Sequence, residues 1–64
     1  MGTKIIQTID GDIRLEERYD ADTSLSFYDV YDVERDRYIG ELWSMNEGTA
    51  LERDLNDFLY EHGY

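Results

Sequence analysis

The sequence has no cysteine and no proline, only one lysine and one histidine, and no long apolar run. Without cysteine, a disulfide framework and a thiolate metal site are both excluded. No apolar stretch approaches the ~20 residues of a membrane-spanning helix, and the first ten residues lack the apolar core of a signal peptide. We therefore expect a cytoplasmic protein, in the host cytoplasm if a phage encodes it. No internal repeat or low-complexity segment marks a domain boundary, so residues 1–64 are expected to form one small domain.

Basic residues are scarce as well: six stand against 16 acidic residues, which gives a formal net charge of −10. Direct binding to nucleic acid or to an anionic membrane is excluded as a result, because both need lysine and arginine. Such a charge favours a basic protein partner, but it is also found in proteins adapted to a salty cytoplasm. Hydrophobic residues still make up 41% of the chain and aromatic residues 14%, which indicates a folded domain.

Two strands joined by a tight turn are expected at the N-terminus. Residues 3–9 are rich in β-branched side chains, and we expect Ile5 and Ile9 to share a face. Asp10-Gly11 is typical of a type I′ turn, which needs positive φ at both central residues. Residues 12–19 alternate apolar and charged side chains, which predicts a strand with one buried face. Its apolar face holds Ile13, Leu15 and Tyr19, and its charged face holds Arg14, Glu16 and Arg18.

The aromatic-rich segment Leu25–Met45 predicts a second hairpin, with arms Leu25–Val33 and Arg37–Met45. Strict alternation in the second arm places Tyr38, Gly40 and Leu42 on one face and Ile39, Trp43 and Met45 on the other. Both faces of the hairpin carry apolar groups, and one helix can cover only one of them. We expect Tyr31 to lie in the core. A face with Tyr28, Val30, Ile39 and Trp43 is then either a partner surface or the face under the helix, and both readings stay open.

The C-terminal segment Thr49–His62 predicts an amphipathic helix. Thr49 and Glu52 have the spacing of a capping box, and Gly63 is the expected stop. The apolar stripe of this helix consists of Leu51, Leu55, Phe58, Leu59 and His62. The predicted fold is therefore α+β: a four-stranded antiparallel meander (ββββα) with one C-terminal helix packed on one face.

No pattern of residues predicts catalysis, and we expect neither an enzyme nor a bound cofactor or metal. Asp20-x-Asp22-x-Ser24 begins like a calcium loop, but the required glycine and final glutamate are replaced by Leu25 and Tyr31. His62 has no nucleophile placed beside it by the sequence, so a structural role at the end of the helix is favoured. With 16 acids in 64 residues, pairs of carboxylates arise by chance.

The leading functional prediction is an acidic binding protein that blocks the basic site of a nucleic-acid-handling protein, such as a nuclease, a repair enzyme or a CRISPR effector. Rows of carboxylates would imitate the phosphates of DNA in part, and an aromatic patch would supply affinity. In size, charge and expected fold the chain is similar to the small acidic inhibitors of phages and mobile elements, an analogy and not a sequence match. The predicted partner-binding residues are Tyr28, Asp32, Glu34, Asp36, Trp43, Asp54, Asp57 and Glu61.

A second hypothesis belongs to a different class of protein. In it the chain is a small structural or oligomerising domain of a salt-adapted organism, with no role connected to nucleic acid. Its acidity then serves solvation, and its aromatic face forms a homodimer interface. The two hypotheses differ in the expected charge map, because mimicry needs carboxylates gathered on one surface.

Overall fold

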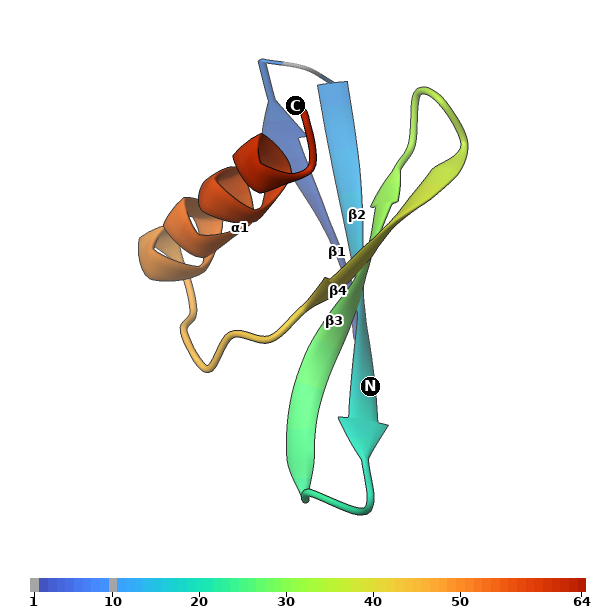
Figure 1. Ribbon diagram of the computed structural model, residues 1–64. Coiled ribbons are helices and arrows are strands. Elements are labelled where there is room, and N and C mark those ends of the chain that lie inside the picture. Colours follow the sequence, from blue (N-terminus) through green and yellow to red (C-terminus); the bar gives the residue numbers. More distant parts are fainter. Residues whose placement is uncertain (1, 10) are drawn as a thin grey trace.

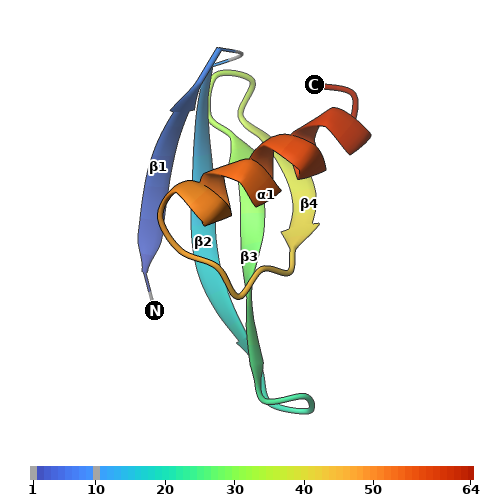
Figure 2. The same ribbon diagram turned by 90° about the vertical axis from the view of Figure 1, so that its left-hand side faces the viewer.

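The computed structural model describes residues 2–9 and 11–64 and confirms the predicted α+β meander. Four antiparallel strands form one sheet in the order β1-β2-β3-β4, and a single helix follows them. Figures 1 and 2 show α1 lying across one face of the sheet, while the opposite face carries no helix or loop layer. The elements are β1 (Thr3–Thr8), β2 (Gly11–Asp20), β3 (Leu25–Asp32), β4 (Arg37–Leu42) and α1 (Thr49–Glu61).

The core lies between α1 and the sheet face that it covers. The most deeply buried side chains come from β2, β3 and the helix, and all of them point into this single layer. This arrangement follows from the two periodicities of the sequence, alternation in the strands and a three-to-four-residue repeat in the helix. The core residues are Ile13, Leu15, Tyr28, Val30, Leu42, Leu51, Leu55, Phe58 and Leu59.

A β-bulge in β4 changes the predicted faces of the central hairpin. Val30 pairs with Gly40, but its neighbour Tyr31 pairs with Tyr38. Ile39 is therefore an extra residue that pairs with no residue of β3. An extra residue shifts the alternation of one strand by one position. Tyr38 therefore joins Tyr31 on the uncovered face, and the expectation that Tyr38 shares a face with Gly40 and Leu42 is wrong. The expectation that Tyr31 lies in the core is also wrong, because it is half-buried on the uncovered face.

The N-terminal hairpin forms as predicted, but Gly11 is the first residue of β2 and not a central residue of the turn. Thr8 pairs with Gly11, and Gly11 has a φ of 117°. Asp10, the other residue of the predicted turn, lies outside the described residues. Ile6 pairs with Ile13 and packs against the core, whereas Ile5 lies on the uncovered face and Ile9 is fully exposed beyond the end of β1.

The ends of the helix are formed by glycine and not by the predicted capping box. Gly48 is the N-cap, with a φ of 62°, and no side chain caps the first turn. The predicted stop is confirmed: Gly63 has a φ of 88°, its N–H donates to Tyr60 O, and the N–H of Tyr64 donates to Leu59 O. This pair of bonds is the Schellman motif, and it turns Tyr64 back toward the sheet.

Candidate partner-binding surfaces

The structure divides the eight predicted partner-binding residues among four environments. Tyr28 and Asp32 are buried under α1, so their predicted place on an accessible surface is wrong. Both fall on the helix-covered side of β3 because they alternate in register with Val30. The other six reach the surface at three separate places, and the structure does not bring them together. Glu34 and Asp36 lie in the β3–β4 turn, Trp43 follows β4, and Asp54, Asp57 and Glu61 lie on α1.

Asp32 is the buried member of a group that holds the last residue of the chain, which we call the C-terminal clasp (Asp32, Arg35 and Tyr64). Asp32 is 1% exposed and accepts hydrogen bonds from Arg35 Nη1 at 2.8 Å and from the Tyr64 hydroxyl at 2.8 Å. The backbone N–H of Arg35 donates to its other oxygen at 3.1 Å. The Arg35 guanidinium holds the pKa of Asp32 below its ordinary value, although burial opposes that shift. The clasp joins the β3–β4 turn to the last residue of the chain.

The β3–β4 turn mixes charges of both signs. Glu34 and Asp36 are exposed, but they alternate along the chain with Arg35 and Arg37. Asp36 occupies the left-handed region with a φ of 49°, which is the conformation that a glycine usually takes and that aspartate tolerates. The predicted acidic row of Asp32, Glu34 and Asp36 is therefore not formed, since one member is buried and the other two lie among arginines.

The outer flank of α1 is an acidic surface. Residues 47–61 contain five acidic residues and one basic residue, a formal charge of −4. Asp57 and Glu61 are exposed and have no ion-pair partner among the described residues. Asp54 lies on the same flank, and the row from Asp54 to Glu61 extends about 10 Å along the helix axis. We call these three residues the acidic flank.

Asp54 also fastens the connection between β4 and the helix. Its Oδ2 accepts hydrogen bonds from Ser44 Oγ at 2.6 Å and from Asn46 Nδ2 at 2.8 Å. These two bonds, Ser44 first, lower the pKa of Asp54 and keep the carboxylate charged. The N–H of Asn46 donates in turn to Ser44 Oγ at 3.1 Å. Asp54 is therefore fixed in place by the linker, whereas Asp57 and Glu61 are free to meet a partner.

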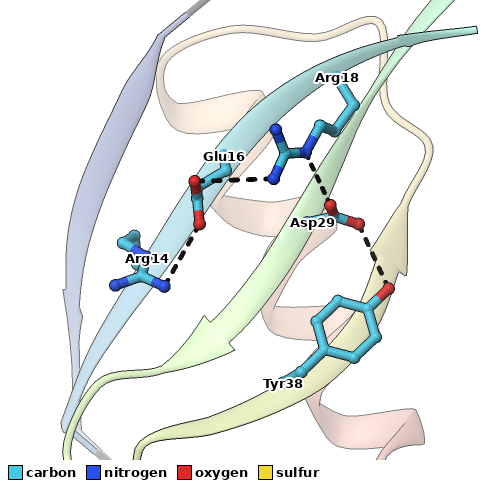
Figure 3. A network of polar contacts seen from close by, with 5 residues as sticks. All are labelled: Arg14, Glu16, Arg18, Asp29 and Tyr38. Carbon is cyan, nitrogen blue, oxygen red and sulfur yellow. Dashed lines mark hydrogen bonds and ion pairs between the residues drawn. The ribbon is translucent and has the colours of Figure 1, made fainter.

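The uncovered face of the sheet carries a chain of paired charges (Figure 3). Glu16 binds Arg14 at 3.3 Å and Arg18 at 3.8 Å, and Arg18 Nε donates to Asp29 Oδ2 at 2.9 Å. The Tyr38 hydroxyl lies 3.3 Å from Asp29 Oδ1 and donates to it. Two guanidinium groups thus face two carboxylates, and the network itself has no net charge.

Aromatic side chains flank this network on the same face. Phe27 and Trp43 stack with their ring centroids 4.5 Å apart, and Tyr31 lies 5.3 Å from Tyr38. The Arg14 guanidinium carbon lies 4.4 Å above the Tyr31 ring, within the range of a cation–π contact. Burial, followed by the nearby Asp29, raises the pKa of Tyr38, so its hydroxyl stays protonated and can donate.

We call this surface the open face. Its apolar groups are not covered: Ile5 is 56% exposed, Tyr38 49% and Trp43 47%. The sequence points to Trp43 but misses Phe27, Tyr31 and Tyr38 as surface residues. The alternation of arginine and glutamate in residues 12–19 signals the charged half of this face, whereas the bulge at Ile39 leaves no signal in the sequence.

A groove of about 450 Å³ lies between β1 and α1, beside the part of the helix that faces the first strand. Apolar groups of Ile6, Ile9, Leu59 and Tyr60 line it, together with a few polar side chains. No group of three or more histidine, cysteine, aspartate or glutamate side chains among residues 2–9 and 11–64 is arranged to hold a metal ion. Within the same residues, no helix is both long and apolar enough to cross a membrane.

The fold and the surfaces define a small α+β protein with one acidic helix flank and one uncovered sheet face. Comparison with family models, with curated proteins and with solved structures gives no significant match to this chain. Its surfaces are therefore the only guide to its function.

Proposed function

We propose that this chain is an acidic binding protein that blocks the basic nucleic-acid-binding site of a host protein, as inhibitors of phages and mobile elements do. The acidic flank of α1 is the recognition surface. The observation that carries the proposal is a contrast in charge: Glu16 and Asp29 on the open face are bound to arginine, whereas Asp57 and Glu61 are exposed and have no ion-pair partner among the described residues.

A carboxylate without an ion-pair partner can bind a lysine or arginine of a basic site without first breaking another ion pair. Asp57 and Glu61 are one turn apart, so their β-carbons are separated by about 6 Å and both point outward from the same flank. Such a row presents separate negative charges along a rigid rod, as a nucleic-acid strand presents its phosphates. At the centre of the open face, by contrast, Glu16 and Asp29 are already bonded to Arg14 and Arg18.

The charge of the whole molecule supports the same role by acting at longer range. A net charge of −10 attracts a positively charged groove and raises the association rate. This steering weakens as salt is added, because the Debye length falls from about 10 Å at 0.1 M to about 3 Å at 1 M. Binding that is strong at low salt and is lost near 1 M is therefore expected of this surface.

The test begins with the immobilised protein and a bacterial lysate, with and without a short competing DNA duplex. Retained proteins that the duplex displaces are identified, purified and titrated against the chain. We expect such a partner to bind the chain and DNA in competition, with an affinity that falls as salt rises. A partner whose binding ignores the duplex and survives molar salt would contradict the proposal.

A pair of double variants locates the site. D57N/E61Q removes two unpaired charges from the flank, and E34Q/D36N removes two charges from the mixed turn, so both variants have a net charge of −8. We expect D57N/E61Q to weaken binding at least tenfold and E34Q/D36N to weaken it only slightly. Asn is compatible with the positive φ of Asp36, so the control variant keeps its turn. Equal losses in the two variants would show that only net charge matters.

A further inference from the structure

We infer that β1 is the interface of a homodimer, in which the edge strands of two copies pair antiparallel and continue one sheet through both chains. β1 is the first strand in the order β1-β2-β3-β4, so the sheet pairs it on its inner edge only. Figure 2 shows no helix or strand beyond its outer edge. This edge is distinct from the acidic flank and from the open face, so the inference does not depend on the proposed function.

The strand register shows which backbone groups of β1 point outward. The N–H of Glu17 donates to Gly2 O, so the pair that precedes β1 in the register is a hydrogen-bonded one. Hydrogen-bonded and non-hydrogen-bonded pairs alternate along an antiparallel ladder. The backbone N–H and C=O groups that point away from β2 are therefore those of Thr3, Ile5 and Gln7. Such a row of donors and acceptors along a sheet edge fits one kind of occupant, an extended strand.

The charge of the segment selects a second copy as the source of that strand. Residues 1–9 are the longest stretch of the chain without an acidic residue, and they contain its only lysine, Lys4. The acidic side chains next to β1 in the sheet, Asp12 and Glu16, belong to β2 and lie one strand further from the partner. A basic strand of another protein would find no carboxylate on β1 to bind. Two copies of β1, in contrast, meet without facing carboxylates although each chain has a net charge of −10.

The other edge of the sheet is protected from such pairing. β4 carries the bulge at Ile39 and the acidic Glu41. Bulges and charged side chains on edge strands prevent pairing with another chain. β1 has a regular register with β2 over all six of its residues, and its Ile5 is 56% exposed. The unprotected edge is therefore also the one without carboxylates.

Two-fold symmetry fixes the register of the dimer. Only a pairing centred on Ile5 uses every outward-facing residue of β1: Ile5 pairs with its own copy, and Thr3 of each chain pairs with Gln7 of the other. Each of these pairs exchanges both of its N–H···O bonds, and the two Ile5 side chains form a β-branched cross-strand contact. Lys4 then lies opposite Ile6 of the other copy, so the two lysines do not face each other.

The same register gives Lys4 an ion-pair partner. Among the described residues neither Lys4 nor Glu52 has one, although the chain contains 16 acids. Ile6 and Glu52 both line the groove between β1 and α1. Cross-strand neighbours lie on the same face of a sheet, so Lys4 of one copy comes beside Ile6, at the groove that Glu52 of the other copy lines. Two such contacts across the symmetry axis offset part of the repulsion between the chains.

Single cysteines test the register directly, because the chain has no cysteine of its own. Hydrogen-bonded partners have α-carbons about 5.5 Å apart, which a disulfide can span. We expect oxidised glutathione to cross-link I5C to its own copy and to leave T3C and Q7C monomeric, because each of these is offset from its own copy by about 13 Å along the strand. An equal mixture of T3C and Q7C should cross-link. If I5C forms no more dimer than T3C or Q7C alone, the inference is overturned.

Sedimentation equilibrium measures association without a cross-link. The mass of the isolated chain should rise with concentration from 7.6 kDa toward twice that value. I5P removes an N–H that points outward and keeps the bonds to β2, whereas I5T keeps both the N–H and the β-branched shape. We expect the dissociation constant of I5P to be at least ten times that of I5T. A wild-type chain that stays monomeric at all concentrations would overturn the inference.

A matched pair of charge variants tests the role of the lysine. K4E and R53E both give a net charge of −12, but Lys4 lies on β1 and Arg53 is exposed on α1. We expect K4E to raise the dissociation constant at least tenfold and R53E to change it less than threefold. Equal effects would contradict the placement of Lys4 at the interface. Circular dichroism verifies that each variant is folded.

Discussion

At the scale of single residues, Asp32 is the one fully buried charge in the described core, in a protein that otherwise keeps its acids at the surface. Its burial is tolerated because its carboxylate oxygens accept three hydrogen bonds, two from Arg35 and one from Tyr64. A buried carboxylate without these donors would be costly. These bonds link the turn after β3 with Tyr64, and they hold the segment that follows α1 against the sheet.

We expect Asp32→Asn to lower the free energy of unfolding by about 1–3 kcal/mol, because the amide cannot satisfy both charged and hydroxyl donors as the carboxylate does. The pKa of Asp32 is depressed below 3.8 in the folded chain, so its contribution is complete above about pH 4 and is lost as the pH falls through the folded value. The difference between wild type and D32N, measured by urea unfolding, should therefore shrink below pH 4. Asp57→Asn, at an exposed site, is the control and should cost nothing. A difference that is independent of pH would contradict this role.

Residue by residue, the sequence predicts the acidic flank better than it predicts the rest of the site. Asp54, Asp57 and Glu61 are placed by the helical repeat, which the helix follows through Glu61. Tyr28 and Asp32 could not be placed, because both faces of β3 carry apolar groups and only the position of α1 decides which face is covered. The clasp also escapes prediction, since Asp32 and Tyr64 are 32 residues apart and meet only through tertiary contact.

At the scale of elements, the close approach of α1 to β4 depends on a residue without a side chain. A β-carbon built on Gly40 would lie 3.3 Å from Phe58 Cζ and 3.4 Å from His62 Cε1. Phe58 and His62 also contact each other, with ring centroids 4.2 Å apart. Gly40 faces the helix by regular alternation with Leu42, and its lack of a side chain lets the helix end pack on the edge of the sheet.

We expect Gly40→Val to lower the free energy of unfolding by about 1–3 kcal/mol, as overpacking of a filled core does. The two added methyl groups must displace the Phe58 ring or lift the end of α1. Thermal unfolding measures the loss, and a reduced near-ultraviolet signal from the aromatic rings would accompany it. Gly2→Val is the control, because a β-carbon at Gly2 meets no atom within 4 Å. Equal stability of the two variants would show that the helix does not depend on this contact.

The elements themselves are largely readable from the sequence, and the exceptions have local causes. The strands and the helix follow their hydrophobic periods, and the Gly63 stop follows from its need for positive φ. The capping box fails because Gly48 takes the cap position, so Thr49 becomes the first helical residue. The predicted faces of β4 fail because an alternation argument assumes an unbroken ladder, and the extra residue Ile39 breaks it.

At the scale of the whole molecule, paired and unpaired charges are distributed unevenly over the surface. Glu16 and Asp29 on the open face are bonded to arginines, the β3–β4 turn is mixed, and residues 47–61 carry an excess of −4. A uniform acidic coat would serve solvation in a salty medium, whereas unpaired carboxylates on one helix flank suit a basic site. The self-repulsion of a charge of −10 destabilises the compact state in either case.

That self-repulsion gives a prediction for the free energy of unfolding, which should rise when sodium chloride is added to the dilute protein. Screening of surface charges is largely complete near 0.15 M, where the Debye length is about 8 Å, so a gain from this cause should level off above that concentration. D57N/E61Q should gain less, because two of the repelling charges are gone. A gain that continues to molar salt would instead favour adaptation to a salty cytoplasm. Stability that does not change with salt would mean that the paired charges of the open face and the clasp already offset the repulsion in the folded chain.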